Sequence, residues 1–360
     1  MHIGLLIYGS LDTLTGGYLY NRLLCQELEA LGDQITILSL PWRNYGRHLS
    51  DNLSRDLYRR LRQAPLDVLI QDELNHPSLV GLNYWLRRRV NYPLVSLIHL
   101  LRHTEPRPAW QNWGYRQIER LYLASVDGFI YNSWDSQRLV AGLVGPRPGV
   151  VGYPGKDHLL TAVSPRHIIR RAHQPGPLRL IYVGNVVRRK GLDLLLDALN
   201  TLPRQQWRLT VIGSLEMEPD YATRLQQQVT QRGQANCVRW LGQLPNEAVA
   251  PHLQAAQLFI MPSRYEGFGI VYMEALGAGL PVLATTAGAA GEMVRSGVNG
   301  YLVKPDDTAA LTRHIQTLHH DRDRLARMGL AAYRRYQKHP TWHETAVAIR
   351  AFLHDLVHSA

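Results

Sequence analysis

A short apolar segment that passes through a glycine turn into a second apolar segment constrains the fold of this chain most. Gln257–Ser263 has the length and composition of a buried strand, and Glu266-Gly-Phe-Gly-Ile-Val-Tyr-Met-Glu274 follows it closely. The glycines therefore fall where a strand gives way to a helix. Backbone N–H groups at such a turn can approach an anion, and the helix dipole favours negative charge there. The two carboxylates would flank that anion and accept hydrogen bonds from sugar or ribose hydroxyls.

The same stretch resembles a family signature. An isolated pair of glutamates would indicate only a strand, a turn and a helix with a surface acid at each end. Here Ser263-Arg-Tyr-Glu266-Gly-Phe-Gly-Ile-Val-Tyr-Met-Glu274, followed by Gly279-Leu-Pro-Val282, is similar to the motif of the retaining family 4 glycosyltransferases (glycosyl transferases group 1). Gly291-Glu292 and Ser296–Val303 also resemble the family pattern.

This resemblance implies an α/β protein of GT-B architecture, with two Rossmann-like, doubly wound domains facing a central cleft and a C-terminal helix that crosses back to the first domain. It also implies a hexosyltransferase in which Glu266 orients the donor sugar and Glu274 holds the ribose. The diphosphate of the donor would lie on the turn formed by Gly267, Phe268, Gly269 and Ile270. No metal or other cofactor is expected, because cationic side chains and helix dipoles offset the charge of the leaving diphosphate.

The length and the element pattern agree with two domains. A chain of 360 residues is long enough to bury two cores. Strand-like segments are Ile3–Tyr8, Gln34–Leu40, Val68–Gln71, Leu94–His99, Gly128–Tyr131, Leu178–Val183, Trp207–Ile212, Val238–Leu241 and Leu258–Ile260. Helix-like segments are Tyr18–Leu31, Arg55–Arg62, Ser78–Arg89, Arg116–Ala124 and Glu344–Val357. We predict an acceptor domain over 1–155, a linker over 156–177 that begins in Gly- and Pro-rich sequence, a donor domain over 178–338, and a returning helix over 339–360.

A second set of candidate residues lies at the start of the predicted donor domain. Val183-Gly-Asn-Val-Val-Arg-Arg-Lys-Gly191 carries a strand into a glycine turn with three cations, which suits a diphosphate. A solvated basic helix cap is the structural alternative. Relatives usually carry Gly-Arg at the turn and Lys-Gly at its end; Lys190-Gly191 matches, but Asn185 stands where Arg is expected. Either Arg188 or Arg189 would supply the second phosphate contact, and we favour Arg189.

The first half offers fewer signals. Gly16 and Gly17 lie where the family has a glycine loop that approaches the donor, although two glycines alone indicate only a tight turn. His99 ends a predicted parallel strand, a position that faces the ligand crevice of an open α/β sheet. For His99, a role near the donor sugar and a purely structural role are equally consistent with the sequence. The candidates for the acceptor site follow it: Arg102, His103 and Glu105.

The formal charge of +11 raises the question of an anionic partner. Only four of the 40 cationic residues are lysines, and arginines cluster at Arg55–Arg62 and Trp85–Arg89 next to apolar residues. Packed amphipathic helices with a solvated arginine face are the favoured reading, and attachment to an anionic membrane surface is the alternative. We expect no nucleic-acid partner, because no familiar binding motif is present.

Composition indicates a cytoplasmic protein, with peripheral attachment to the inner face of the membrane as an option. No run of about 18 apolar residues is present. Cys25 and Cys237 lie far apart, which argues against a disulfide scaffold and a zinc site.

The sequence therefore predicts a retaining transferase that moves a sugar from a nucleoside diphosphate sugar to a hydroxyl acceptor, a lipid-linked or glycolipid precursor being one candidate. The catalytic candidates are His99, Lys190 and Glu266. Two alternatives remain at this point: a GT-B glycoside phosphorylase, which would use inorganic phosphate, and a basic binding protein without catalysis.

Overall fold

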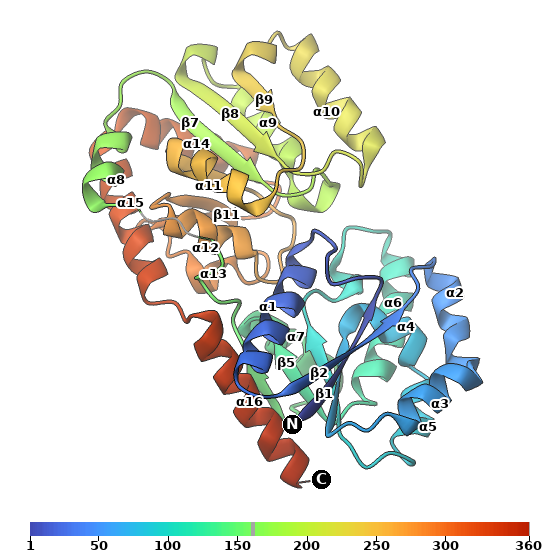
Figure 1. Cartoon of the computed structure of the whole chain (residues 1–360). Helices are drawn as coiled ribbons and strands as arrows, with labels where there is room; N and C mark the ends of the chain where they lie inside the picture. Colours follow the sequence, from blue (N-terminus) through green and yellow to red (C-terminus); the bar gives the residue numbers. More distant parts are fainter. Residues whose placement is uncertain (160–162, 360) are drawn as a thin grey trace. The chain divides into compact units, whose positions relative to one another are not determined.

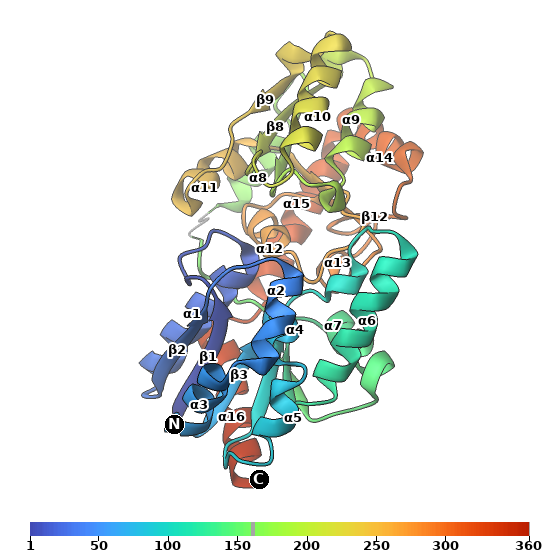
Figure 2. The same ribbon diagram turned by 90° about the vertical axis from the view of Figure 1, so that its right-hand side faces the viewer.

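The chain forms two compact units, each built on a parallel sheet. The computed structural model describes residues 1–159 and 163–359 (Figures 1 and 2). Residues 1–155 and 340–360 form the first unit, and residues 156–339 form the second.

The first unit has a six-stranded sheet in the order β2-β1-β3-β4-β5-β6. Its strands are β1 (His2–Tyr8), β2 (Gln34–Leu40), β3 (Val68–Asp72), β4 (Leu94–Ile98), β5 (Gly128–Tyr131) and β6 (Gly149–Val151). Its helices are α1 (Gly16–Ala30), α2 (Tyr45–Ser50), α3 (Arg55–Gln63), α4 (His76–Leu79), α5 (Leu82–Leu86), α6 (Ala109–Leu123), α7 (Trp134–Val144) and α16 (Trp342–Ser359). Helices α1 and α16 lie on one face of the sheet and α3 to α5 on the other (Figure 1).

Helices on both faces explain why the central strands are apolar throughout. Every residue of β3, β4 and β5 is buried, as expected for parallel strands covered on both sides. The core joins strand residues such as Leu69 and Phe129 to helix residues such as Leu86 and Tyr122. The strand order reverses between β1 and β3, so ligands of such a sheet bind beyond the carboxyl ends of these strands.

The second unit repeats this plan with the strand order β12-β11-β10-β7-β8-β9. Its strands are β7 (Leu178–Val183), β8 (Trp207–Ile212), β9 (Val238–Trp240), β10 (Leu258–Met261), β11 (Val282–Thr285) and β12 (Gly300–Val303). Its helices are α8 (Pro165–Ala172), α9 (Leu192–Asn200), α10 (Pro219–Gln231), α11 (Asn246–Ala255), α12 (Ile270–Gly277), α13 (Ala290–Met293), α14 (Thr308–His320) and α15 (Arg322–Gln337). Here the order reverses between β7 and β10, which pair in parallel with Leu258 opposite Leu180.

The linker predicted over 156–177 is wrong. Helix α8 falls inside it and packs on α15 as part of the second unit. Ser164 caps this helix by accepting the His167 N–H at 3.2 Å, and Pro165 occupies its first turn. Ile168 is buried where a Cβ on Gly279 would meet its Cδ1 at 2.4 Å, so the helix fits closely against the turn before β11. The Gly- and Pro-rich stretch before it also contains β6, which pairs with β5.

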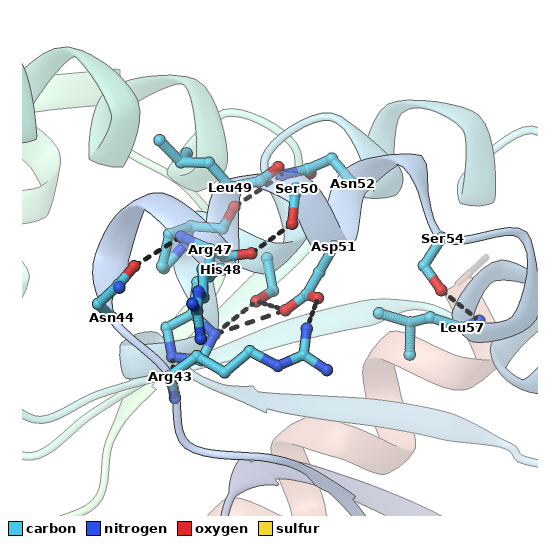
Figure 3. Close-up of polar contacts among 12 residues, drawn as sticks. Arg43, Asn44, Arg47, His48, Leu49, Ser50, Asp51, Asn52, Ser54 and Leu57 are labelled. Atoms are coloured by element: carbon cyan, nitrogen blue, oxygen red, sulfur yellow. Dashed lines mark hydrogen bonds and ion pairs between the residues drawn. The ribbon is translucent and has the colours of Figure 1, made fainter.

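The single helix predicted over Ser78–Arg89 is also wrong, because the chain breaks into α4 and α5. The Asn52 side chain, which follows α2, accepts the N–H groups of Gly81 and Leu82 at 2.7 and 3.1 Å. Its amide nitrogen donates to the carbonyls of Leu49 and Pro77, the first of which is drawn in Figure 3. These side-chain bonds replace the helical ones at the junction.

Helix α16 packs on α1 and β6, so the C-terminal segment belongs to the first unit. Arg350 ties it there through its Nε, which lies 2.7 Å from the buried Asp33 carboxylate. No helix among the described residues is long and apolar enough to span a membrane. Cys25 and Cys237 are buried free thiols in different units.

Candidate functional site

The loops after β7 and β10 meet at the point where the second sheet reverses its order. The 3₁₀ turn Arg188–Lys190 follows β7 and ends at Gly191, whose φ is +69°. A Cβ on Gly191 would lie 2.1 Å from the Pro262 carbonyl oxygen, so only glycine allows this approach. The Arg264 N–H also donates to the Arg189 carbonyl at 2.7 Å. The two loops therefore form one continuous backbone surface at the switch point.

Lys190 and Glu266 form a buried ion pair in this surface. Lys190 Nζ donates to Glu266 Oε2, and the Arg189 guanidinium lies 3.5 Å from the same oxygen. The Glu266 side chain is 11% exposed and the Lys190 side chain 13%. The Ser263 hydroxyl is also directed at this carboxylate, at 3.5 Å. Two cations thus share one carboxylate in a site largely shielded from water.

The pKa shifts of this pair follow from burial and charge. Burial by itself would raise the pKa of Glu266, but the charges of Lys190 and Arg189 outweigh it and hold that pKa below its ordinary value. Burial lowers the pKa of Lys190, and the Glu266 charge opposes that change. With Glu266 ionised and both basic side chains protonated, the three groups carry a net charge of +1 (two minus one).

Arg264 holds the two loops together and was missed from the sequence. Its Nη1 and Nη2 lie 3.1 and 2.9 Å from the two oxygens of Asp193, in the first turn of α9. Its Nη1 also donates to the Arg188 carbonyl at 2.6 Å. The Tyr221 hydroxyl donates to the same Asp193 carboxylate at 2.7 Å. The only sequence signal for this contact was the position of Arg264 inside the glutamate motif.

Arg188 and Arg189, the two candidates for the second phosphate contact, have different partners in the structure. Arg188 is 61% exposed in its side chain and lies 3.8 Å from Glu218. Arg189 is 19% exposed, lies over Glu266 and donates to the Tyr265 carbonyl at 2.9 Å. The geometry therefore favours Arg189 as the second cation beside Lys190.

The glycine turn before α12 has the geometry that an anion site needs. Gly269 adopts φ +80° and caps α12, and a Cβ there would lie 2.6 Å from the Tyr272 ring. The N-terminal turn of α12 begins at Ile270 and carries no acidic side chain. Phe268 differs from its neighbours in the predicted donor site, since its side chain is 2% exposed and packs near the His339 ring. The Phe268 side chain is therefore part of the core and is not placed to contact a ligand.

Glu274, the second glutamate of the motif, lies in α12 and contacts a residue that the sequence did not suggest. His158 Nε2 lies 2.8 Å from Glu274 Oε1. The His158 side chain is 2% exposed and that of Glu274 is 12% exposed. His158 belongs to the segment that enters the second unit, inside the stretch predicted as a linker. The sequence around it contains no motif that would identify it as a site residue.

In the first unit, His99 lies within a closed polar network at the end of β4. Asn21 Nδ2 donates to Asp72 Oδ2 at 2.6 Å, which leaves Asn21 Oδ1 as an acceptor. His99 Nε2, 2.9 Å from that oxygen, must therefore carry the ring proton. Burial lowers the pKa of His99, against the opposing charge of Asp72. His99 is thus a neutral imidazole of defined tautomer, with its Nδ1 as a hydrogen-bond acceptor.

The residues around His99 also form the one group of possible metal ligands found among the described residues. Asp72, Glu73 and His99 each offer a ligand atom, and these atoms lie within 4.8 Å of one another. However, Glu73 already accepts the N–H groups of His99 and Leu100 at 2.9 and 3.1 Å. Burial and the neighbouring Asp72 charge raise the pKa of Glu73. A divalent cation would have to displace these donors, so the donor set fits a hydrogen-bond network better than a metal.

Gly16 and Gly17 are the first two residues of α1, not part of a loop before it. Thr15 caps the helix, so α1 begins two residues earlier than predicted. A Cβ on Gly17 would lie 3.3 Å from the His99 ring, so Gly17 and His99 are neighbours. The structure therefore brings together two residues that the sequence proposed separately.

The predicted acceptor residues lie in and beside the 3₁₀ turn Arg102–Thr104 after β4. The Arg102 guanidinium lies 5.1 and 4.8 Å from the ring centroids of Tyr45 and Tyr115, whose rings contact each other edge to face. His103 Nδ1 lies 2.6 Å from the buried Glu119. Glu105 forms an ion pair with Arg107. Glu119 and Tyr45 were not predicted, because they come from α6 and α2.

Comparison with known proteins agrees with this fold. A family model described as glycosyl transferases group 1 matches residues 165–335. A D-inositol 3-phosphate glycosyltransferase of Nocardiopsis dassonvillei is 30% identical over 318 residues, which cover 78% of this chain and 71% of that protein. The lipopolysaccharide core biosynthesis mannosyltransferase LpsB of Rhizobium meliloti is 31% identical over 179 residues, covering 48% of this chain and 50% of that protein.

Solved structures show the same architecture at low sequence identity. The sucrose-phosphate synthase of Thermosynechococcus elongatus superposes with a TM-score of 0.84 at 20% identity and covers 99% of both chains. Anabaena HepE in complex with UDP-glucose superposes with a TM-score of 0.77 at 22% identity and covers 100% of both chains.

The two doubly wound parallel sheets match the GT-B fold of these structures. The chain belongs to the glycosyl transferases group 1 family and is a transferase of sugar residues.

Proposed function

We propose that this glycosyltransferase takes its sugar from a nucleoside diphosphate sugar bound at the switch point of the second unit. The observation that carries the proposal is the buried set of Lys190, Arg189 and Glu266 beside the glycine turn before α12. Because HepE was solved with UDP-glucose, a UDP-sugar is the first donor to test.

The electrostatics of this site suit a diphosphate leaving group. When the bond to the sugar breaks, negative charge grows on the diphosphate. Lys190 and Arg189 are already oriented by Glu266 and by the Tyr265 carbonyl, so they need little reorganisation to stabilise that charge. Backbone N–H groups at the start of α12 would add to this stabilisation. These groups together take the part that a metal ion has in other transferases, and we propose that the reaction needs no metal.

The two glutamates would then have different tasks. Glu266 would hold the donor sugar and keep Lys190 charged, since its carboxylate contacts both cations. Glu274, four residues into α12, would accept hydrogen bonds from the ribose hydroxyls. His158 holds the Glu274 carboxylate at 2.8 Å and so orients it.

In the first unit, we propose that His99 accepts a hydrogen bond from a substrate hydroxyl through Nδ1. This role follows from its tautomer, because the Nε2–H group donates to Asn21 Oδ1 and Nδ1 is left as an acceptor. A side chain at Gly17 would approach this ring to 3.3 Å, so glycine there keeps the ring accessible to a ligand, and we propose that the adjoining Gly16 belongs to the same site. We further propose that the sugar is transferred with retention of configuration, on the basis of the glutamate motif.

We propose a hydroxyl acceptor that carries or adjoins an anionic group, in line with the inositol phosphate and lipopolysaccharide core named for two relatives. Arg102 supports this, because its guanidinium lies against the rings of Tyr45 and Tyr115 and has no carboxylate within 4.0 Å among the described residues. A lipid-linked acceptor would also give a reason for the basic surface described next.

We define the basic surface as five arginines and three apolar or aromatic residues that are exposed on α3, α5 and their flanks: Arg59, Arg60, Arg62, Arg88, Arg89, Leu53, Tyr84 and Trp85. Helices α3 and α5 are in contact and lie side by side in both ribbon views. Leu53 is 86% exposed and Trp85 62%. Arginines around exposed apolar side chains are typical of surfaces that attach to anionic lipid. We propose a cytoplasmic protein that attaches peripherally to the membrane through this surface.

A thermal-shift screen with UDP, GDP, ADP and their sugars tests the donor proposal. A nucleotide at a hundred times its dissociation constant should add about 2.7 kcal/mol to the free energy of unfolding. Turnover of the matching sugar should persist in the presence of a chelator, and a strict requirement for a divalent ion would contradict the metal-free mechanism. If inorganic phosphate supports the reaction while no nucleotide binds, the chain is a phosphorylase. If nothing binds except lipid, it is a binding protein.

A further inference from the structure

A second basic cluster lies in the second unit, at the amino ends of the strands and therefore away from Lys190 and Glu266. Helix α8 ends in Arg170 and Arg171, and Arg179 is the second residue of β7. These residues surround a cavity of about 220 Å³. Its polar lining consists of His167, Arg170, Arg171, Gln174, Arg179 and Gln254.

The cavity concentrates positive charge without acidic partners. Across residues 1–159 and 163–359, no carboxylate lies within 4.0 Å of a side-chain nitrogen of Arg170, Arg171 or Arg179. By contrast, Arg264 and Arg232 of the same unit each pair with an aspartate at 2.9 Å. The three arginines thus bring three positive charges to one cavity with no countercharge from this part of the chain.

Arg171 is the most deeply placed of the three. It is 3% exposed, and its guanidinium donates to the carbonyls of Gln254, Ala278 and Gly279 at 2.9, 2.9 and 2.8 Å. Carbonyl dipoles orient the group but do not cancel its charge. Burial, and secondly the charge of Arg179, lowers the pKa of Arg171 to about 10. It therefore stays charged at neutral pH in a place where an unpaired charge is costly.

Arg179 is held in a similar way. Its Nε donates to the Ala255 carbonyl at 2.7 Å, and its Nη2 donates to the Gln174 side chain. Burial lowers the pKa of Arg179 as well. Two guanidinium groups are thus fixed in orientation at the cavity, while Arg170 lies exposed at its rim. A fixed pair of guanidinium groups loses little conformational freedom when it binds a planar or tetrahedral oxyanion.

We propose that this cavity is a second anion site, which binds a phosphoryl group and is separate from the diphosphate site of the donor. Arginine forks match the oxygens of phosphate, and a bound phosphate supplies the countercharge that the described residues lack. A water molecule occupies about 30 Å³ in the liquid, so the cavity has room for such a group. The phosphoryl group can belong to a free phosphate compound or to a phospholipid headgroup.

Calorimetric titration with sodium phosphate, against sodium chloride at equal ionic strength, tests the proposal. We expect wild-type protein to bind phosphate, and Arg170→Ala and Arg179→Ala to bind it at least tenfold more weakly. Arg166→Ala is the matched control, since Arg166 is an exposed arginine of α8 that does not line the cavity. Lys190→Ala removes the cation of the donor site, so phosphate binding that remains in this variant and is lost with Arg170→Ala or Arg179→Ala belongs to the cavity.

The two sources of the phosphoryl group are separated by a second arm with phosphatidylglycerol vesicles. Binding of vesicles that depends on Arg170 and is reduced by free phosphate indicates a lipid headgroup, whereas phosphate binding without any Arg170-dependent vesicle binding indicates a free ligand. Full affinity in both cavity variants, a loss confined to Lys190→Ala, or no binding in either arm would each overturn the proposal. None of these outcomes depends on nucleotide binding, so the proposed function stands or fails separately. Melting curves of every variant establish that it is folded.

Discussion

Replacement of Lys190 by methionine tests the proposed leaving-group site most directly. Methionine fills much of the same volume but carries no charge. In the wild type, Lys190 is the closer of the two cations to Glu266, and Arg189 lies 3.5 Å away. The variant therefore keeps one cation and loses the other, so the local charge falls from +1 to zero. Removal of one preorganised charge-stabilising group typically costs about 10²- to 10³-fold in kcat, or roughly 3 kcal/mol.

The same substitution leaves the Glu266 carboxylate with Arg189 as its remaining cation. Loss of one partner of a buried ion pair usually costs about 3–5 kcal/mol of stability, and the partial exposure of both side chains together with Arg189 should keep the loss below that range. Steady-state transfer kinetics, nucleotide affinity by calorimetry and chemical denaturation should be measured together. Lys304→Met is the matched control, because Lys304 is an exposed lysine of the same unit.

The double substitution with Glu266→Gln completes a mutant cycle. Because the two side chains are in contact, their effects on stability should be non-additive. If Lys190→Met retains kcat within threefold of wild type while folded, the charge-based mechanism is wrong. A loss of equal size in Lys304→Met would show that the assay reports general charge and not this site.

Three further predictions rest on other parts of the molecule. Glu274→Ala and His158→Ala should raise KM for the donor with little change in kcat, whereas Glu266→Ala should lower kcat more than donor affinity. Identical kinetics for the two glutamate variants would contradict the division of roles. Burial lowers the pKa of His76 to about 4, so the ring stays neutral in the folded protein at pH values where the unfolded chain already protonates it. The free energy of unfolding should therefore fall by roughly 3 kcal/mol as pH drops from about 6.5 to 4. Urea denaturation of wild type and His76→Gln at several pH values should show a shallower fall in the variant. Each arginine of the basic surface should add about 1 kcal/mol of attraction to anionic lipid, so the protein should float with anionic vesicles at low salt only. Replacement of Arg59, Arg62 and Arg88 by Glu should abolish flotation without affecting nucleotide affinity. A protein that stays unbound with anionic and neutral lipid at both salt concentrations has no such attachment.

The candidate site could be predicted from the sequence where its residues are neighbours in the chain. The Glu266–Glu274 motif and the Lys190-Gly191 turn each lie within one loop, and periodicity placed both loops after a strand. The structure then shows them in contact although 76 residues separate Lys190 from Glu266. That contact depends on β7 lying beside β10 in the sheet, which no local pattern specifies.

Residues that act through long-range contacts were missed for the same reason. His158 lies in the segment predicted as a linker, but it contacts Glu274, which is 116 residues away in the sequence. The sequence suggested no role for Asn52, but its side-chain amide accepts the Gly81 N–H and so interrupts the helix there. The sequence pattern of that helix was apolar at the right spacing, so only the packed structure reveals the competing hydrogen bonds.

The sequence by itself determined the class of fold, because alternating strand and helix periods leave few arrangements other than doubly wound parallel sheets. It also determined which functional groups are available, since the two loop motifs supply the carboxylates, cations and glycines. Tertiary structure decided which of these groups meet. The order of strands in each sheet selected the Lys190–Glu266 pair, the tautomer of His99 and the unpaired arginines around Arg171, because each depends on side chains from separate strands and helices that only folding brings within a few ångströms.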